Sequence, residues 1–355
     1  MPTIVEVAKR AGVSIATVSN VIRGTKKVSA ALQQRVEAAI RELDYYPNEI
    51  ARSLKVKQTR MLGIVVPDIT NPFFPEIVRG AEDIAYERGY FLVTANTDEQ
   101  IGRERRIVAA LRSYRADGIL LASAPGNDVG HIRRIIESGL PVVCLDRPVS
   151  GVETDAVLLD NVRGSRECVR HLIQMGHRRI ALITGQLQAE ISRERLKGYE
   201  EALREADIKV DPTLVMEGDF REESGYRLTR QLLQKRIPVT AIFACNGVMT
   251  LGALKAFEEL GIKCPDQMAL ATFDDLAVDH SFHPHLTAVV QPSYEIGARA
   301  ATILIDRIEG KLKGRLSVVR IVPALVVRES TSRKISEQRS PVTAARRVIR
   351  AKGTR

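Results

Sequence analysis

The sequence predicts an all-α head at the N-terminus, followed by an α/β body with two lobes. The first 47 residues hold three short patterns in which apolar residues recur every three or four positions, the period of a helix. From residue 61 to 332, short apolar runs alternate with amphipathic stretches, which is typical of parallel sheets flanked by helices. Eight or more such runs exceed one doubly wound half, so two parallel sheets are expected.

The first helix is predicted from Thr3 and Glu6, which have the spacing of a capping box. Gly12 ends the pattern, because glycine is favoured just past the last turn of a helix. The apolar face between these signals consists of Ile4, Val7, Ala8 and Ala11.

Ser14 is a good N-cap for a second helix, and Gly24 stops that helix. Ser29 can cap a third helix. Two short helices that are separated by a glycine-containing turn and backed by a third helix make a helix-turn-helix. The inner positions are Val18, Val21 and Ile22 in the second helix and Leu32, Val36, Ala39, Ile40 and Leu43 in the third.

In a helix-turn-helix, the second helix lies in the major groove of DNA and its N-terminal residues reach the base edges. Thr17 and Ser19 are suited to phosphate contacts, and the amide of Asn20 suits an adenine edge. Ile15 or Ala16 can touch a thymine methyl group. The alternative is a three-helix subdomain that docks on the rest of the chain.

The charge of the chain is concentrated at its two ends. Residues 1–60 carry 11 Lys or Arg and 5 Asp or Glu, and residues 333–355 carry 8 and 1, whereas residues 61–332 carry 34 and 37. Two basic ends on a near-neutral body indicate a polyanionic partner, either nucleic acid or an anionic membrane surface. We expect residues 333–355 to be a disordered, solvated tail, with auxiliary phosphate contact as the alternative.

Several classes of protein are excluded by composition. No run of about 18 apolar residues predicts a membrane span, and the N-terminus lacks the apolar region of a secretory signal, so a cytoplasmic protein is expected. The cysteines form no C-x-x-C pair, which favours reduced thiols over a zinc site or a disulfide framework. They are Cys144, Cys168, Cys245 and Cys264.

The head and the segment after it resemble the lactose-repressor (LacI/GalR) family. The resemblance rests on TIVEVAKRAGVS at 3–14, ATVSNVI at 16–22, LDYYPN at 43–48 and ARSL at 51–54, and it continues to about residue 330. It implies a body of the periplasmic-binding-protein type. It also implies a transcriptional repressor that binds a pseudo-palindromic operator as a homodimer under the control of a small effector.

The segment that resembles the family hinge is predicted to form a short helix. Asn48 can cap a helix over 49–56, which is shorter than the about 12–15 residues that an isolated helix needs, so it should order only against DNA and a partner copy. The resemblance implies that Leu54 enters the minor groove as an apolar wedge; a surface leucine on a linker is the alternative. The predicted DNA contacts are Thr3, Ser14, Ile15, Ala16, Thr17, Ser19, Asn20, Asn48, Ala51, Arg52, Leu54 and Lys55.

The resemblance also implies how the chain is divided. The expected parts are the head at 1–47, the hinge helix and linker at 48–60, a DNA-proximal lobe at 61–161 with 292–320, a distal lobe at 162–291 with 321–332, and the tail. Predicted strands within the lobes lie at 62–66, 91–95, 119–122, 142–145, 157–159, 180–184, 241–244 and 268–271. Predicted helices include 75–88, 162–175 and 193–205.

Ligands of such folds bind outside the carboxyl ends of strands, often between domains. Side chains near those ends supply hydrogen-bonding groups and apolar faces, as a hydroxyl-rich ligand requires. The predicted effector contacts are Asn71, Phe73, Phe74, Asp146, Arg147, Arg195, Phe220, Asn246, Asp274 and Gln291.

The resemblance implies that Arg195, Asn246 and Asp274 grip sugar hydroxyls, so that the effector is a sugar or a sugar derivative. Gly247 departs from the family, in which Asp often follows the asparagine, and this indicates a different hydrogen-bonding set. Arg147 and Arg195 together would also suit a carboxylate or a phosphate.

Two other functions compete with this interpretation. A solute-binding protein of the same two-lobed type conflicts with the helix-turn-helix and with the missing signal. An enzyme is not expected either, because the sequence holds no G-x-S-x-G, G-x-G-x-x-G, P-loop or H-E-x-x-H motif. His280, His283 and His285 lie around Pro284 and are interpreted as a polar surface turn, so neither a metal nor a cofactor is expected.

Overall fold

The computed structural model describes residues 2–24, 26–46, 58–126, 128–234, 238–275 and 284–332. The chain divides into two compact units, Met1–Thr59 and Arg60–Arg355. Within the described part, every helix is too short or too polar to cross a membrane.

The first unit contains the predicted helices α1 (Ile4–Ala11), α2 (Ile15–Arg23) and α3 (Ala30–Glu42). The capping box at Thr3 is confirmed, and so is the cap of α2, where the Ser14 hydroxyl accepts from the backbone N–H of Thr17 at 3.1 Å. Gly12 and Gly24 end α1 and α2 in the left-handed conformation, with φ of 62° and 60°. Ser29 occupies the N-cap position of α3, but its side chain makes no capping hydrogen bond.

A small apolar core holds these three helices together, and α3 is also tied to the turn after α1. The Arg35 guanidinium donates to the carbonyl of Ala11 at 2.6 Å, so it satisfies a backbone group that the end of α1 leaves open. The buried members of the core are Val7, Ala8, Ala11, Val18, Val36, Ala39 and Tyr45.

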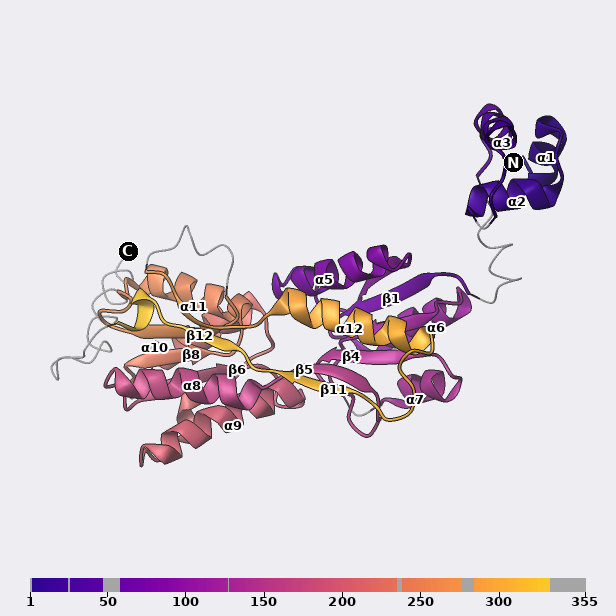
Figure 1. Ribbon diagram of the computed structural model, residues 1–355. Helices are drawn as coiled ribbons and strands as arrows, with labels where there is room; N and C mark the ends of the chain where they lie inside the picture. Colours follow the sequence, from indigo (N-terminus) through magenta and orange to yellow (C-terminus); the bar gives the residue numbers. More distant parts are fainter. Residues whose placement is uncertain are drawn as a thin grey trace. The chain divides into compact units, whose positions relative to one another are not determined.

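The second unit consists of two α/β lobes, each built on a six-stranded sheet within the described residues (Figure 1). The sheet of the first lobe has the order β11-β5-β4-β3-β1-β2 and that of the second lobe β12-β10-β9-β8-β6-β7. The strands of the first lobe are β1 (Met61–Val66), β2 (Phe91–Asn96), β3 (Gly118–Leu121), β4 (Val142–Asp146), β5 (Asp155–Leu159) and β11 (Val318–Ile321). Those of the second are β6 (Ile180–Thr184), β7 (Val215–Glu217), β8 (Ala241–Ala244), β9 (Ala269–Phe273), β10 (Thr287–Val290) and β12 (Ala324–Val326).

Helices cover both faces of each sheet, as the alternating pattern predicts. In the first lobe, α5 and α12 lie together on one face and α6 and α7 on the other; in the second lobe, α8 and α9 form one layer and α10 and α11 the other (Figure 1). The helices are α5 (Phe73–Glu87), α6 (Ile101–Ser113), α7 (Gly130–Glu137), α8 (Asn161–Gln174), α9 (Glu190–Glu205), α10 (Glu222–Gln234), α11 (Gly247–Leu260) and α12 (Ser293–Ile308).

The chain crosses between the lobes three times, after β5, after β10 and after β11. The two-lobed parallel fold is therefore confirmed, while the residue boundaries predicted for the domains stay predictions. All eight predicted strands are present, and the sequence pattern missed β7, β10, β11 and β12, each of which is only three or four residues long. Strand β12 is antiparallel to its neighbour β10, whereas β11 is parallel to β5.

Candidate functional site

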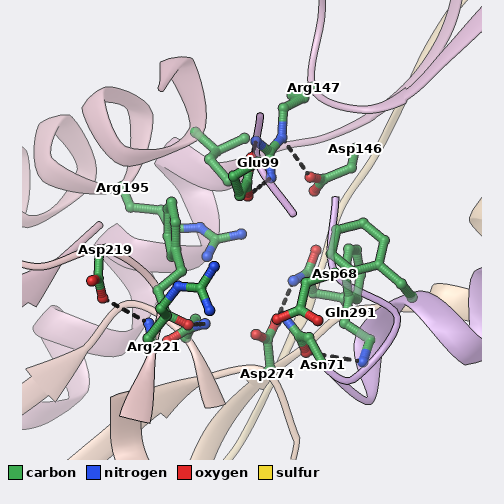
Figure 2. Close-up of a pocket in the computed structure, with 15 residues that line it drawn as sticks. Asp68, Asn71, Glu99, Asp146, Arg147, Arg195, Asp219, Arg221, Asp274 and Gln291 are labelled. Carbon is green, nitrogen blue, oxygen red and sulfur yellow. Dashed lines mark hydrogen bonds and ion pairs between the residues drawn. The ribbon is translucent and has the colours of Figure 1, made fainter. Parts of the chain in front are cut away.

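A pocket of about 40 Å³ lies where strands of both sheets end, and all ten predicted effector contacts line it (Figure 2). Loops after the strands carry most of these residues, as expected for a ligand site in parallel α/β folds. The lining residues are Asp68, Asn71, Phe73, Phe74, Glu99, Asp146, Arg147, Ile191, Arg195, Asp219, Phe220, Arg221, Asn246, Asp274 and Gln291.

Arg147, in the first lobe, is held by carboxylates on two sides. Its Nε donates to Asp146 Oδ2 at 3.2 Å, and its Nη1 and Nη2 donate to the two carboxylate oxygens of Glu99 at 3.0 and 3.2 Å. Burial by itself would lower the pKa of Arg147, but the charges of Glu99 and Asp146 outweigh it, and the pKa lies above its ordinary value. Arg147 therefore stays charged, and its direction is fixed by the wall of the pocket.

Arg195, in the second lobe, has a different environment. Its guanidinium carbon lies 3.7 Å from the ring centroid of Phe273, and its Nε donates to Asn161 Oδ1 at 2.9 Å. Its Nη1 donates to the backbone carbonyl of Cys245. Figure 2 shows the guanidinium groups of Arg195 and Arg221 pointing into the space between the other labelled side chains.

Asp274 lies at the end of β9 and binds two neighbours within the second lobe. It accepts from the side-chain amide of Gln291, and from the backbone N–H of Gly247 at 3.2 Å. Burial raises the pKa of Asp274, although Arg195 and both hydrogen bonds oppose that effect. Gly247, the departure from the family pattern, thus contributes a backbone donor that holds a carboxylate in place.

The two asparagines of the pocket each accept a backbone N–H at the start of a helix. Asn246 Oδ1 accepts from the backbone N–H of Met249 at 2.9 Å, so Asn246 caps α11. Asn71 Oδ1 accepts from the backbone N–H of Phe73 at 3.1 Å at the start of α5. Each therefore fixes the beginning of a helix that borders the pocket.

The three predicted aromatic contacts divide between the lobes. Phe73 and Phe74 are buried side by side in an edge-to-face arrangement, with ring centroids 5.0 Å apart. Phe220 belongs to the second lobe and is only partly buried. A ligand between the lobes would therefore meet apolar rings as well as polar groups.

Four lining residues that are not glycine have a left-handed backbone. The φ angles of Glu99, Asp146, Phe220 and Asp274 are 57°, 66°, 65° and 75°. Such conformations are uncommon outside glycine and are found where the surrounding structure holds a side chain in an unusual direction, as at ligand clamps.

A second cavity of about 180 Å³ adjoins the pocket and shares four of its residues. The shared residues are Asn71, Phe73, Asp274 and Gln291; the others are Pro72, Glu76, Asp275, Val290 and Ser293. Together the two cavities offer more room than the pocket alone.

Sequence reasoning missed five lining residues. Glu99 follows the predicted strand at 91–95, so the rule that ligands lie outside strand ends would have found it if it had been applied to every strand. Ile191 lies on a helix and carries no polar signal. The missed residues are Asp68, Glu99, Ile191, Asp219 and Arg221.

The predicted DNA contacts of the first unit lie at the start of α1 and along α2. The Thr3 and Ser14 side chains are engaged as caps, and the Ser14 hydroxyl is also 2.9 Å from that of Thr17. Ile15 and Ala16 are exposed, whereas Thr17, Ser19 and Asn20 are half-buried. The predicted contacts at Asn48, Ala51, Arg52, Leu54 and Lys55 lie outside the described residues.

Among the described residues, no group of three or more His, Cys, Asp or Glu side chains is arranged to hold a metal ion. His280 and His283 lie outside that part of the chain, and His285 is 3.1 Å from the carboxylate of Glu329.

Family models match both units of the chain. Residues 3–48 match the model described as bacterial regulatory proteins, lacI family, and residues 169–331 match the periplasmic binding protein-like domain. The HTH-type transcriptional repressor PurR of Pasteurella multocida is 35% identical over 94% of this chain and 100% of its own length. The repressor of the same name from Histophilus somni is 36% identical over 93% of this chain and 99% of its own.

Solved structures match over nearly the whole chain too. The Lac repressor dimer bound to operator and the anti-inducer ONPF has a TM-score of 0.82 at 28% identity, with 93% of this chain and 99% of that one covered. The complex of the transcriptional regulator CelR with cellobiose has a TM-score of 0.71 at 36% identity, with 93% and 100% covered.

Proposed function

Because the chain belongs to the lacI family of bacterial regulatory proteins, we propose that it is a repressor whose affinity for operator DNA is controlled by a small effector in the pocket between its lobes. The convergence of residues from eight strand ends or adjoining helices on one pocket carries this proposal. A sugar or sugar derivative is the effector class, because the pocket combines aromatic rings with donors and acceptors. CelR, a relative of the same fold, was solved with cellobiose.

The head supplies the DNA contacts in this proposal. The exposed start of α2 enters the major groove, and the hinge at 48–56, with Leu54 as its wedge, enters the minor groove. One head offers few base contacts, so a homodimer on a pseudo-palindromic site is expected. Affinity for the operator should fall steeply with salt, because basic residues release counterions from the phosphates.

Effector control requires two conformations of the body that bind the effector differently. Three chain crossings join the lobes, and the pocket has walls in both of them. An effector that contacts both walls therefore favours one relative position of the lobes. A change in that position alters the geometry in which a dimer presents its two heads and hinges.

The test of the effector site is a thermal-shift screen of sugars, sugar acids, sugar phosphates and nucleobases, followed by operator binding with and without each hit. Asp274→Asn should abolish the response to a compound found in the screen, because the Asp274 carboxylate lines the pocket. Operator binding without effector should stay unchanged, because the predicted DNA contacts lie in the head and the hinge. Asp266→Asn, a carboxylate of the same lobe outside the pocket, is the matched control. A variant at Asp274 that responds at the parental concentration would contradict the proposal.

The test of the DNA-binding surface uses Asn20→Ala and Leu54→Ala. The first should change base preference within each half-site by about 1–3 kcal/mol, the range for one base-edge contact. The second should reduce operator bending, measured by energy transfer between dyes on the two DNA ends, while effector binding stays as in the parent. Unchanged preference and unchanged bending would remove these residues from the interface.

A further inference from the structure

We propose that Glu99 makes the pocket select uncharged effectors over anionic ones, because it occupies the guanidinium group of Arg147 and adds a carboxylate to the wall. This inference rests on the proposed effector site and specifies the chemical class that the site accepts. It decides between the two classes that Arg147 and Arg195 leave open in the sequence, hydroxyl-rich ligands and carboxylates or phosphates.

The hydrogen-bonding capacity of Arg147 is nearly exhausted. A guanidinium group has five N–H donors. Three of them bond to Asp146 and Glu99, and a fourth, on Nη1, donates to the carbonyl of Ser123 at 3.4 Å. Binding a phosphate or a carboxylate in the usual two-pronged way would require Arg147 to leave Glu99.

The charge of the pocket also disfavours an anion. Five carboxylates and three guanidinium groups line it among the described residues, and the adjoining cavity adds two carboxylates, of which Asp275 is paired with Arg328. The carboxylates of the pocket are Asp68, Glu99, Asp146, Asp219 and Asp274, and those added by the adjoining cavity are Glu76 and Asp275.

The open hydrogen-bonding groups point to a ligand that both donates and accepts. Asp146 Oδ1 and Gln291 Oε1 are buried and have no donor within the described structure. Arg195 uses two of its five N–H groups, on Asn161 and Cys245, and so retains donors at the pocket. A hydroxyl or amide group satisfies both kinds of partner, whereas a carboxylate or a fully ionised phosphate offers the acceptors no proton.

The experiment uses inorganic phosphate as the probe and needs no knowledge of the natural effector. Thermal unfolding of the full-length protein is followed in phosphate and in chloride at equal ionic strength. The parent should show little phosphate-specific stabilisation, whereas Glu99→Ala should bind phosphate at least about tenfold more tightly, since a charged donor is freed. Glu99→Gln should give a smaller gain, because its amide oxygen still accepts from Arg147.

A double variant and a control assign the gain to this site. Glu99→Ala with Arg147→Gln should lose it, which separates the pocket from phosphate bound at the basic head. Asp98→Asn removes a neighbouring carboxylate that is paired with Arg103 instead, and it should behave as the parent. The inference is wrong if the parent itself binds phosphate through Arg147, or if both Glu99 variants are indistinguishable from the parent.

The screen for effectors provides a second measurement. If an uncharged compound binds, its phosphorylated or oxidised analogue should bind the parent at least about tenfold more weakly and regain affinity in Glu99→Ala. An anionic compound that proves to be the best ligand overturns the inference but leaves the effector site intact. Failure of every compound to bind through Asp274 contradicts the proposed function itself.

Discussion

The two lobes share one strand order, but the pocket arginine of the first lobe has charged partners and that of the second lobe has neutral ones. Arg147 of the first lobe lies between two carboxylates, whereas Arg195 of the second lies on the ring of Phe273 and bonds to neutral oxygens. The same residue type therefore does two different jobs. The first arginine fixes acceptors in place and has little capacity left, and the second retains donors for a ligand.

The role of a charged residue in the pocket therefore depends on its partners as well as on its own charge. The carboxylates that hold Arg147 are themselves held by it, since Asp146 and Glu99 both pair with its guanidinium group. Neutral partners orient an arginine without neutralising it.

The largest effect is expected from Arg147→Ala in the first lobe. The substitution leaves Asp146 and Glu99 with no cation between them, and breaking a buried ion pair in this way costs about 3–5 kcal/mol. Urea unfolding of the full-length protein at neutral pH measures the loss. Adding Glu99→Ala should recover part of the loss, because one of the two unpaired charges is removed. A double variant no more stable than the single one would mean that the unpaired carboxylates do not cause the loss.

Acid should affect the second lobe through His177, which is almost fully buried and hydrogen-bonded to Thr240 at 3.0 Å. Burial lowers the pKa of His177 from 6.5 to about 4, and His171 adds to the effect. Between these pH values the unfolded chain takes up a proton that the folded chain does not, so stability falls as pH falls from about 6.5 to 4, by about 3 kcal/mol at most.

The measurement is the free energy of unfolding of the parent and of His177→Gln across that pH range, in which the variant should lose less. His131, the buried histidine of the first lobe, lies 2.6 Å from Glu104, and His131→Gln is the matched variant for the other lobe. If the loss of stability at low pH disappears in His131→Gln and persists in His177→Gln, the loss originates in the first lobe and this prediction is wrong.

The head, the alternation of strands and helices, and ten of the residues that line the pocket could be predicted from the sequence, because each of these depends on local signals. Caps, glycine stops and apolar periods act over a few residues, and strand ends converge by the geometry of a parallel sheet. What it did not predict was which groups bond to which. Arg147 and Glu99 pair with each other although they are 48 positions apart in the sequence. No local pattern marks that pair, and none marks the stacking of Arg195 on Phe273.

In the second lobe, Arg195→Met should lower the free energy of unfolding by about 2 kcal/mol, which is less than the loss expected for Arg147→Ala. Methionine keeps the length of the side chain on Phe273, and the two lost hydrogen bonds go to neutral acceptors rather than to carboxylates. Urea unfolding gives the cost, and calorimetry with a hit from the screen should show that binding is lost. If Arg195→Met still binds the ligand, Arg195 is not the donor that the ligand needs, and Arg147 becomes the candidate for that role.

The smallest difference concerns one bidentate Arg–Asp pair in each lobe. In the first lobe, Arg307 Nε and Nη2 donate to Asp155 at 2.8 and 2.9 Å, and the pair is nearly buried. In the second, Arg328 Nη1 and Nη2 donate to Asp275 at 2.9 and 2.7 Å, with about a quarter to a third of each side chain exposed. Water screens the second pair more, so Asp155→Asn should lower the free energy of unfolding by about 2 kcal/mol and Asp275→Asn by about 1 kcal/mol or less.

Both losses are measured by urea unfolding at low and at high salt. The loss at Asp275 should shrink more with salt, because exposed charges are screened more strongly than buried ones. Equal losses of stability with equal salt dependence would mean that burial does not make the two Arg–Asp pairs differ in strength.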